Sequence, residues 1–202
     1  MIERELEKEY KALLTKEQFE DLKDYFAQFT EVLKPYIQTN YYFDIENFGL
    51  IEKGTTIRIR HKENTWELQI KIPKVHVTGY FEQQELRQSL SVSEAKQYIQ
   101  EGLPIDHPLL KEVWNEKKIG FGINPVNRLK VVGSLQTKRH DFKFYTDIIS
   151  LDESTYFDIT DYELEWETTN HKFVQYELNK LNITPEAVGK ITRFLQALRE
   201  KK

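Results

Sequence analysis

Glu7-Lys8-Glu9-Tyr10-Lys11 and Tyr162-Glu163-Leu164-Glu165-Trp166-Glu167 are the two stretches that decide the fold. In an extended strand, successive side chains point to opposite faces. The first stretch therefore places two glutamates and a lysine on one face, and the second places three glutamates on one face. The simplest explanation for these charged faces is contact with water, because many antiparallel sheets have one solvated face. The remaining strands decide between that explanation and a functional one.

Two neighbouring segments, Thr56-Ile57-Arg58-Ile59-Arg60 and Trp66-Glu67-Leu68-Gln69-Ile70-Lys71, alternate strictly between polar and apolar residues. Their apolar positions carry residues that favour strands, so both segments are predicted to be extended. The intervening stretch, 61–65, is short and polar, which indicates a hairpin. The hairpin would bring the two charged faces side by side.

Further segments also have the composition of strands, which brings the total to about eight. They are residues 37–44, 77–87, 128–136 and 137–151, the last read as either one strand or two.

Eight antiparallel strands can close into a barrel whose interior receives every second side chain. Either the apolar faces fill the barrel and the charges meet solvent, or the apolar faces point outward and the charges line a hydrophilic tunnel. The second arrangement requires helices that cover the outer wall.

Five helices are predicted, and each needs an apolar surface to cover. Capping boxes begin two of them, at Thr15 and at Ser91, and the second of these helices ends at Gly102. The others span residues 108–118, residues 171–181 and a segment that begins at Thr184-Pro185. These helices favour the tunnel. The predicted fold is therefore α+β, an eight-stranded antiparallel β-barrel with helices packed on the outside.

The composition predicts one domain over residues 1–202, because no linker, repeat or low-complexity tract divides the chain. There is no cysteine, no signal peptide and no long apolar run, so a cytoplasmic protein without membrane contact is expected. The net charge of −4 comes from interspersed acidic and basic residues. That pattern argues against general nucleic-acid binding.

The ordered set of charged strand residues resembles the CYTH superfamily, also called the triphosphate tunnel metalloenzymes. The resemblance extends from about residue 3 to residue 195, and it implies an eight-stranded tunnel with opposed acidic and basic patches. Most members hydrolyse a triphosphate with a divalent metal, and others cyclise ATP or act on thiamine triphosphate or RNA 5′-triphosphates. The residues that carry the resemblance are Glu7, Glu9, Lys11, Arg58, Arg60, Lys71, Glu82, Arg139, Glu163 and Glu165.

The resemblance implies a carboxylate site for Mg²⁺ or Mn²⁺, which both prefer oxygen ligands. Its predicted metal ligands are Glu7, Glu9, Glu82, Asp152, Glu163 and Glu165. A regular strand can direct only one of Glu82 and Glu85 inward. We expect Glu82 to be that residue, with Glu85 as the alternative if a bulge shifts the register.

A triphosphate carries about four negative charges, which Arg and Lys side chains must neutralise. The predicted substrate-binding residues are Lys11, Arg58, Arg60, Lys71, Arg139 and Lys190, and Lys190 resembles the lysine of the family's C-terminal helix. Three of the predicted site residues are expected to act in catalysis, namely Glu163, Glu165 and Lys190.

The expected function is metal-dependent hydrolysis of inorganic tripolyphosphate or a small organic triphosphate. Adenylate cyclase and thiamine triphosphatase on the same scaffold remain alternatives, as does a module that binds triphosphate or polyphosphate without turnover. A β-barrel with a solvated charged face is the structural alternative. The histidines lack ligand spacing, and glycine-rich phosphate loops and a G-x-S-x-G motif are missing.

Overall fold

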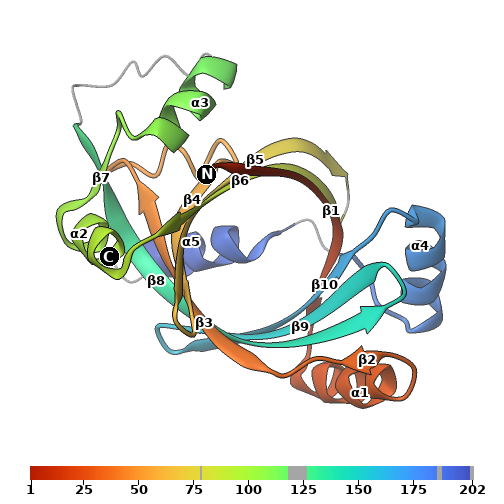
Figure 1. Ribbon diagram of the computed structural model, residues 1–202. Coiled ribbons are helices and arrows are strands. Elements are labelled where there is room, and N and C mark those ends of the chain that lie inside the picture. The colour runs from red at the N-terminus through yellow and green to blue at the C-terminus, as the bar shows by residue number, and fades with distance from the viewer. Residues whose placement is uncertain (78, 118–126, 186–187, 201–202) are drawn as a thin grey trace. The chain divides into compact units, whose positions relative to one another are not determined.

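The computed structural model describes residues 1–77, 79–117, 127–185 and 188–200 (Figure 1). Its described residues form eight long strands and two strands of two residues each. The long strands are β1 (Glu3–Leu14), β3 (Tyr36–Asp44), β4 (Thr56–Lys62), β5 (Thr65–Val77), β6 (Tyr80–Leu90), β8 (Arg128–Phe144), β9 (Asp147–Tyr156) and β10 (Ile159–Glu167). The short ones are β2 (Glu31–Val32) and β7 (Leu103–Pro104).

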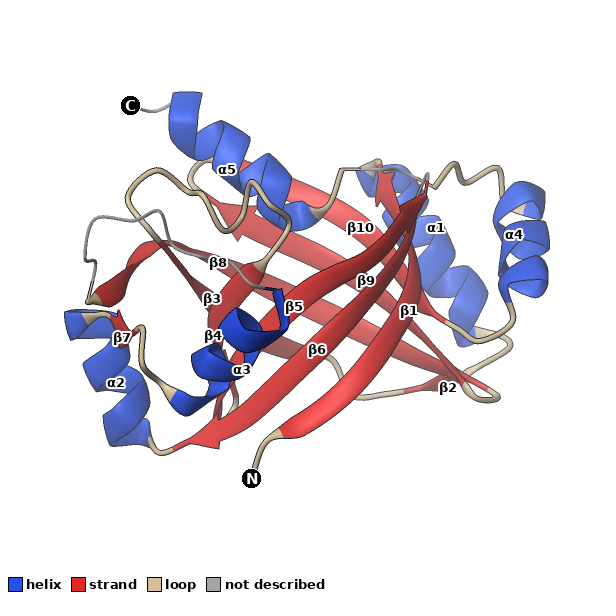
Figure 2. Ribbon diagram, turned by 90° about the horizontal axis from the view of Figure 1, so that it is seen from above, coloured by secondary structure: helices blue, strands red, loops and turns tan. Residues whose placement is uncertain are grey.

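The long strands pair in a closed order. Starting from β8, the neighbours are β3, β4, β5, β6, β1, β10 and β9, and β9 also pairs with β8. Figure 2 shows β1, β10 and β9 side by side, and both pairings among them are antiparallel. The prediction of a closed eight-stranded antiparallel barrel is therefore confirmed.

Contacts within the chain divide it into two compact units, which several long strands cross. The first unit contains Met1–Glu5, Thr39–Ile72 and Glu85–Ser134. The second unit contains Leu6–Gln38, Pro73–Gln84 and Leu135–Lys202. Each unit has its own hydrophobic core and its own set of charged side chains, and each is described separately below.

Five helices lie in the described residues, as predicted. They are α1 (Lys16–Ala27), α2 (Val92–Glu101), α3 (Pro108–Lys117), α4 (His171–Lys180) and α5 (Lys190–Glu200). Both predicted capping boxes form, with Thr15 bonded to Gln18 and Ser91 bonded to Glu94. Each box satisfies backbone donors that the first turn of a helix would otherwise leave unpaired.

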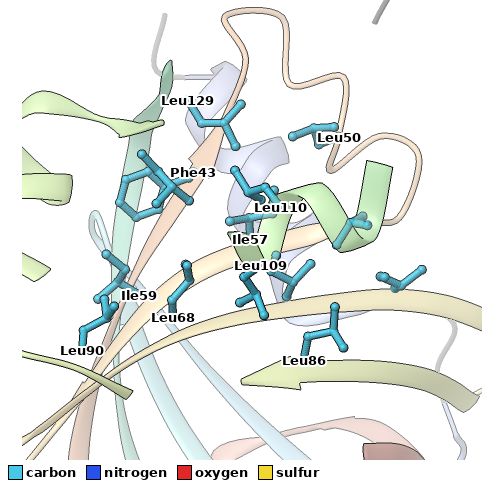
Figure 3. Close-up of a cluster of buried hydrophobic side chains, with 14 of the residues drawn as sticks. Phe43, Leu50, Ile57, Ile59, Leu68, Leu86, Leu90, Leu109, Leu110 and Leu129 are labelled. Carbon is cyan, nitrogen blue, oxygen red and sulfur yellow. The ribbon is translucent and has the colours of Figure 1, made fainter. Parts of the chain in front are cut away.

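The core of the first unit joins its strands to α2 and α3. Ile57, Ile59 and Leu68 are fully buried, and they belong to one cluster with Leu109 and Leu110 of α3 (Figure 3). Because β4 alternates, its arginines point away from this cluster. The helices thus cover the apolar face of the strands, as the sequence predicted.

The core of the second unit is built in the same way under α1 and α4. Phe19 and Phe26 of α1 pack with Trp166 of β10, and Val174 and Leu178 of α4 belong to the same cluster. The opposite face of β10 carries its glutamates. Burial of apolar surface stabilises the fold by about 25 cal/mol per Å². The apolar face of each strand therefore packs under the helices, and the opposite face is the one that can carry charge.

Two predicted boundaries are wrong. The segments 128–136 and 137–151 do not divide between residues 136 and 137, because β8 runs without a break to Phe144 and β9 begins at Asp147. The last helix begins at Lys190 rather than at Thr184-Pro185, since residues 183–185 are not helical. Lys118, the predicted end of α3, lies outside the described residues.

Candidate active site

The charged face of the second unit is assembled by strand register. Glu165 lies opposite Lys11 of β1, and Glu163 lies opposite Asp152 of β9. Asp152 in turn lies opposite Arg139 of β8. Residues directly opposite each other in antiparallel strands have neighbouring side chains. The register alone therefore brings five of the predicted site residues onto adjacent positions.

Arg139 holds two of these carboxylates together. Its Nε and one terminal nitrogen donate to the two oxygens of Asp152, at 2.6 and 2.7 Å, and the same terminal nitrogen donates to Glu165 at 2.6 Å. Burial opposes the charge of Arg139, but the carboxylates outweigh it and raise its pKa well above the ordinary value. Such bidentate geometry is a strong form of ion pair, and it also suits a phosphate group.

Lys11 lies between carboxylates of its own strand and of β10. Its ammonium is 2.8 Å from Glu9 and 3.3 Å from Glu165. Burial works against this charge, yet Glu165, Glu9, Glu163 and Glu7 together raise the pKa of Lys11 well above the ordinary value. Lys11 therefore stays protonated, and the structure brings Glu7 and Glu9 into its surroundings.

Two basic residues of α5 reach the same carboxylates. Lys190 bonds to Asp152 and lies 3.5 Å from Glu165 and 3.8 Å from Glu163. Arg193 bonds to Glu163 and, at 2.8 Å, to Asp161. These contacts surround the acidic cluster with positive charge.

Glu163 is buried at the centre of these contacts. Its side chain is 1% exposed, and burial raises its pKa even though Lys190 and Arg193 oppose that effect. Its Oε1 accepts no hydrogen bond from any residue that the structure describes. For Asp152, by contrast, Arg139 and Lys190 outweigh burial and lower the pKa. The two carboxylates thus differ in their affinity for a proton.

The first unit has a separate charged cluster around Glu85. Arg58 donates to Gln69 at 2.9 Å and lies 3.8 Å from Glu85, which also accepts from Arg87 at 2.5 Å. Burial raises the pKa of Glu85, but the positive charges of Lys71, Arg58 and Arg87 lower it to about 2. Three basic residues therefore hold one buried carboxylate in its charged form.

The other predicted arginine of β4 has a neutral partner. Arg60 donates to the side-chain oxygen of Asn40 at 3.2 Å. Arg58, Arg60 and Lys71 thus lie in the first unit, with Asn40 and Gln69 as polar neighbours.

The expectation that Glu82 faces the charged side is wrong. Leu86 and Leu90 belong to the core of the first unit, and regular alternation along β6 places Glu82 on their face of the strand and Glu85 on the other. Glu82 accepts instead from the hydroxyl of Tyr80, which lies 3.4 Å from His171. No bulge is needed for Glu85 to face the arginines.

Sequence reasoning missed Arg193, Asp161 and Arg87 as members of the charged clusters. Arg193 follows Lys190 by three residues, so both lie on one face of a helix. That spacing was available in the sequence. Asp161 continues the alternating row of Glu163 and Glu165 by two residues in the other direction.

Comparison with known protein families identifies the family of this chain. The sequence matches the CYTH domain over residues 5–194, which is nearly the whole chain. The chain belongs to the CYTH family.

Relatives of this CYTH chain carry two kinds of name. A Bacillus subtilis (strain 168) protein called "Putative triphosphatase YjbK" is 29% identical over 204 residues, with 98% of each chain covered. A crystal structure from Bacillus halodurans, described as a putative adenylate cyclase, is 30% identical and has a TM-score of 0.75, covering 95% of this CYTH chain and 98% of the other.

A third similar structure shows likeness of fold alone. It is a Hippeastrum protein described as a putative adenylyl cyclase with a dominant triphosphatase activity, 20% identical with a TM-score of 0.75. The alignment covers 95% of this chain and 96% of the Hippeastrum chain. Among the described residues of the present chain, none of the helices is long and apolar enough to span a membrane.

Proposed function

We propose that this protein hydrolyses the terminal phosphoanhydride bond of a triphosphate with the help of a divalent metal ion. The observation that carries the proposal is the alternation of carboxylates and cations on one face of the second unit. Family membership and the name of the Bacillus subtilis relative support the same activity. A polyanion with its metal needs both signs of charge in one place.

Carboxylates of the second unit fit Mg²⁺ or Mn²⁺ by their chemistry, since both ions prefer oxygen ligands. In the part of the chain that the structure describes, no group of three or more acidic or histidine side chains is arranged to hold a metal as it stands. Glu163 nevertheless has a buried oxygen that accepts no hydrogen bond from a described residue. A cation held nearby by the other carboxylates would offset the burial of that charge.

The metal ligands that we propose in the second unit are Glu7, Glu9, Asp152 and Glu165, whereas Glu163 keeps its Oε1 available for a proton. When bound, the metal would supply Lewis-acid polarisation of the phosphoryl oxygens.

Basic residues of the second unit would hold the phosphates. Arg139 offers a planar pair of donors, and Lys11 and Lys190 offer point charges that remain protonated. On substrate binding, these donors would exchange carboxylate partners for phosphate oxygens. Arg58, Arg60 and Lys71 of the first unit remain predicted phosphate ligands.

Glu163 is suited to take the proton of the attacking water at Oε1. A carboxylate whose pKa is raised by burial is a better base near neutral pH than an ordinary one. The water oxygen would bond to the terminal phosphorus while the bridging P–O bond breaks, releasing inorganic phosphate and a diphosphate.

Adenylate cyclase is a second candidate, because the Bacillus halodurans structure is described by that activity. A cyclase would release pyrophosphate from ATP, whereas a triphosphatase releases orthophosphate. A module that only binds triphosphate would release neither.

The test is a screen of product release. Tripolyphosphate, ATP, GTP and thiamine triphosphate are each incubated with Mg²⁺, Mn²⁺ or chelator, and orthophosphate, pyrophosphate and cyclic AMP are measured. We expect metal-dependent orthophosphate, and a loss of at least about a hundredfold in Glu163→Gln, which cannot take the proton. Wild-type turnover in Glu163→Gln would refute the assignment, and cyclic AMP with pyrophosphate would favour the cyclase.

We further propose that residues 1–202 act as a single domain in the cytoplasm, with a small triphosphate rather than nucleic acid as the partner. The absence of cysteine and the interspersed charges support this proposal.

A further inference from the structure

An aromatic stack lies beside Lys11 in the second unit. The imidazole of His76 stacks on the ring of Phe81, with centroids 4.4 Å apart and planes inclined by 19°. The ammonium of Lys11 lies over the same Phe81 ring, 5.6 Å from its centroid. Lys11 also contacts Glu9 and Glu165. Lys11 therefore contacts both the stack and the acidic cluster.

The two rings of the stack differ in exposure. Phe81 is 8% exposed, whereas His76 is exposed near the end of β5. Phe81 covers one face of the imidazole, so the exposed surface includes the other face. Planar heteroaromatic rings bind to such faces because stacking requires no particular pattern of hydrogen bonds. The stack can thus be extended by one more ring.

Gly79, just before β6, lies close to two other segments of the chain. The backbone N–H of Lys11 donates to the carbonyl of Gly79 at 2.9 Å. A Cβ atom at Gly79, whose φ is +72°, would lie 2.1 Å from the Cβ of Pro185. Gly79 is therefore held between β1 and Pro185. A platform fixed in this way loses little conformational freedom when a ligand binds.

We propose that His76 and Phe81 form a stacking platform for the ring of an organic triphosphate. This inference rests on the proposed function and narrows its substrate class. The ring of the substrate would stack on His76, and its phosphates would bind at Lys11 and the neighbouring cations. Nucleoside triphosphates and thiamine triphosphate share this chemistry. Inorganic tripolyphosphate has no ring and would leave the platform unused.

The test compares substrates in His76→Ala, with ATP, thiamine triphosphate and tripolyphosphate as probes. Removing one stacking partner should lower kcat/KM for a ring-bearing substrate by about tenfold, mainly through KM. The kcat/KM for tripolyphosphate should not change. His76→Tyr keeps an aromatic face and should restore the ring-bearing substrate. A response to only one of ATP and thiamine triphosphate supports the platform and identifies the ring.

His61 provides a matched control. Its imidazole stacks on Trp66, with centroids 3.9 Å apart and planes inclined by 14°. Trp66 packs against the hydrophobic core of the first unit, so this stack belongs to the apolar face. His61→Ala should leave the preference between ATP and tripolyphosphate unchanged.

Two results would overturn the platform. One is an equal loss of kcat/KM for tripolyphosphate and for the ring-bearing substrates in His76→Ala, and the other is no loss for either ring-bearing substrate. If no triphosphate is hydrolysed, the proposed function fails, and calorimetric binding of ATP and tripolyphosphate decides the inference by itself. Weaker binding of ATP alone in His76→Ala supports the platform, and any other pattern refutes it.

Discussion

Arg139 has the most carboxylate contacts of the basic residues on β8. It bonds to both oxygens of Asp152 and to Glu165, which lie on two neighbouring strands. Taking such charges out of water is compensated only while the partners remain together. Arg139 therefore sets the spacing of the acidic cluster before any ligand arrives.

Replacing Arg139 by Met should destabilise the protein by about 3–5 kcal/mol, because two buried carboxylates lose a partner. Urea denaturation measures this change. Adding Asp152→Asn to Arg139→Met removes a buried carboxylate that has lost its bidentate partner and should recover part of the loss, which a double-mutant cycle detects. Equal unfolding midpoints for Arg139→Met and the wild type would contradict a structural role for the ion pair.

The start of α3 depends on a histidine. The Nδ1 atom of His107 accepts a hydrogen bond from the backbone N–H of Leu109 at 3.2 Å. Burial lowers the pKa of His107, although Glu94 and Asp106 act in the opposite direction. The helix is thus capped by a neutral imidazole.

A depressed pKa in the folded state makes stability fall as the pH falls, because the unfolded chain then binds more protons. His107 contributes to folding stability above its unfolded-state pKa of about 6.5. This contribution is lost as the pH falls through the lower pKa of His107 in the folded state. His107→Asn retains an acceptor that does not titrate. Between pH 7.5 and pH 5.5, the melting temperature of the wild type should fall more than that of His107→Asn. Parallel curves would refute the cap.

Local signals in the sequence were sufficient for most elements. The capping boxes at Thr15 and Ser91 predicted α1 and α2, and alternation predicted the charged faces of β1, β4, β5 and β10. The spacing of Glu82 and Glu85 alone does not show which of them faces the charged side, whereas the apolar positions Leu86 and Leu90 do. Those leucines fix the face of β6 through burial.

Other features depend on contacts that the sequence does not reveal. The late start of α5 is one, because Thr184-Pro185 has the local signature of a helix start and the helix nevertheless begins at Lys190. The stack of His76 on Phe81 is a second such feature, because the identities of the two residues do not predict that their strands pair in this register. The sequence likewise does not reveal which carboxylates pair with Lys11, Lys190 and Arg193, because those contacts form only in the folded protein.

At the scale of the whole molecule, each unit gathers charge on the face opposite its core. Like charges in a partly desolvated place lower stability, and a ligand with metal cancels that effect only in the folded state. The protein should therefore respond strongly to a polyanion.

Tripolyphosphate with Mg²⁺ or Mn²⁺ should raise the melting temperature of the full chain. At a ligand concentration about a hundredfold above Kd, binding stabilises the fold by about 2.7 kcal/mol. For a domain of this size, that gain corresponds to a rise of about 5–10 °C. Monophosphate at matched ionic strength is the control, and it should give much less. An equal shift with both anions would mean that the charged strand faces bind no extended polyanion.

The contacts of α5 also bear on how the chain is made. Asp152, Glu163 and Glu165 precede Lys190 and Arg193 in the sequence, so they leave the ribosome first. Chains begin to fold during synthesis, from the N-terminal side. In that interval β9 and β10 already carry their carboxylates, while two of the cations that will face them are still inside the exit tunnel. Until α5 emerges, Arg139 is already available to Asp152 and Glu165, whereas Glu163 lacks both of the α5 cations that will face it.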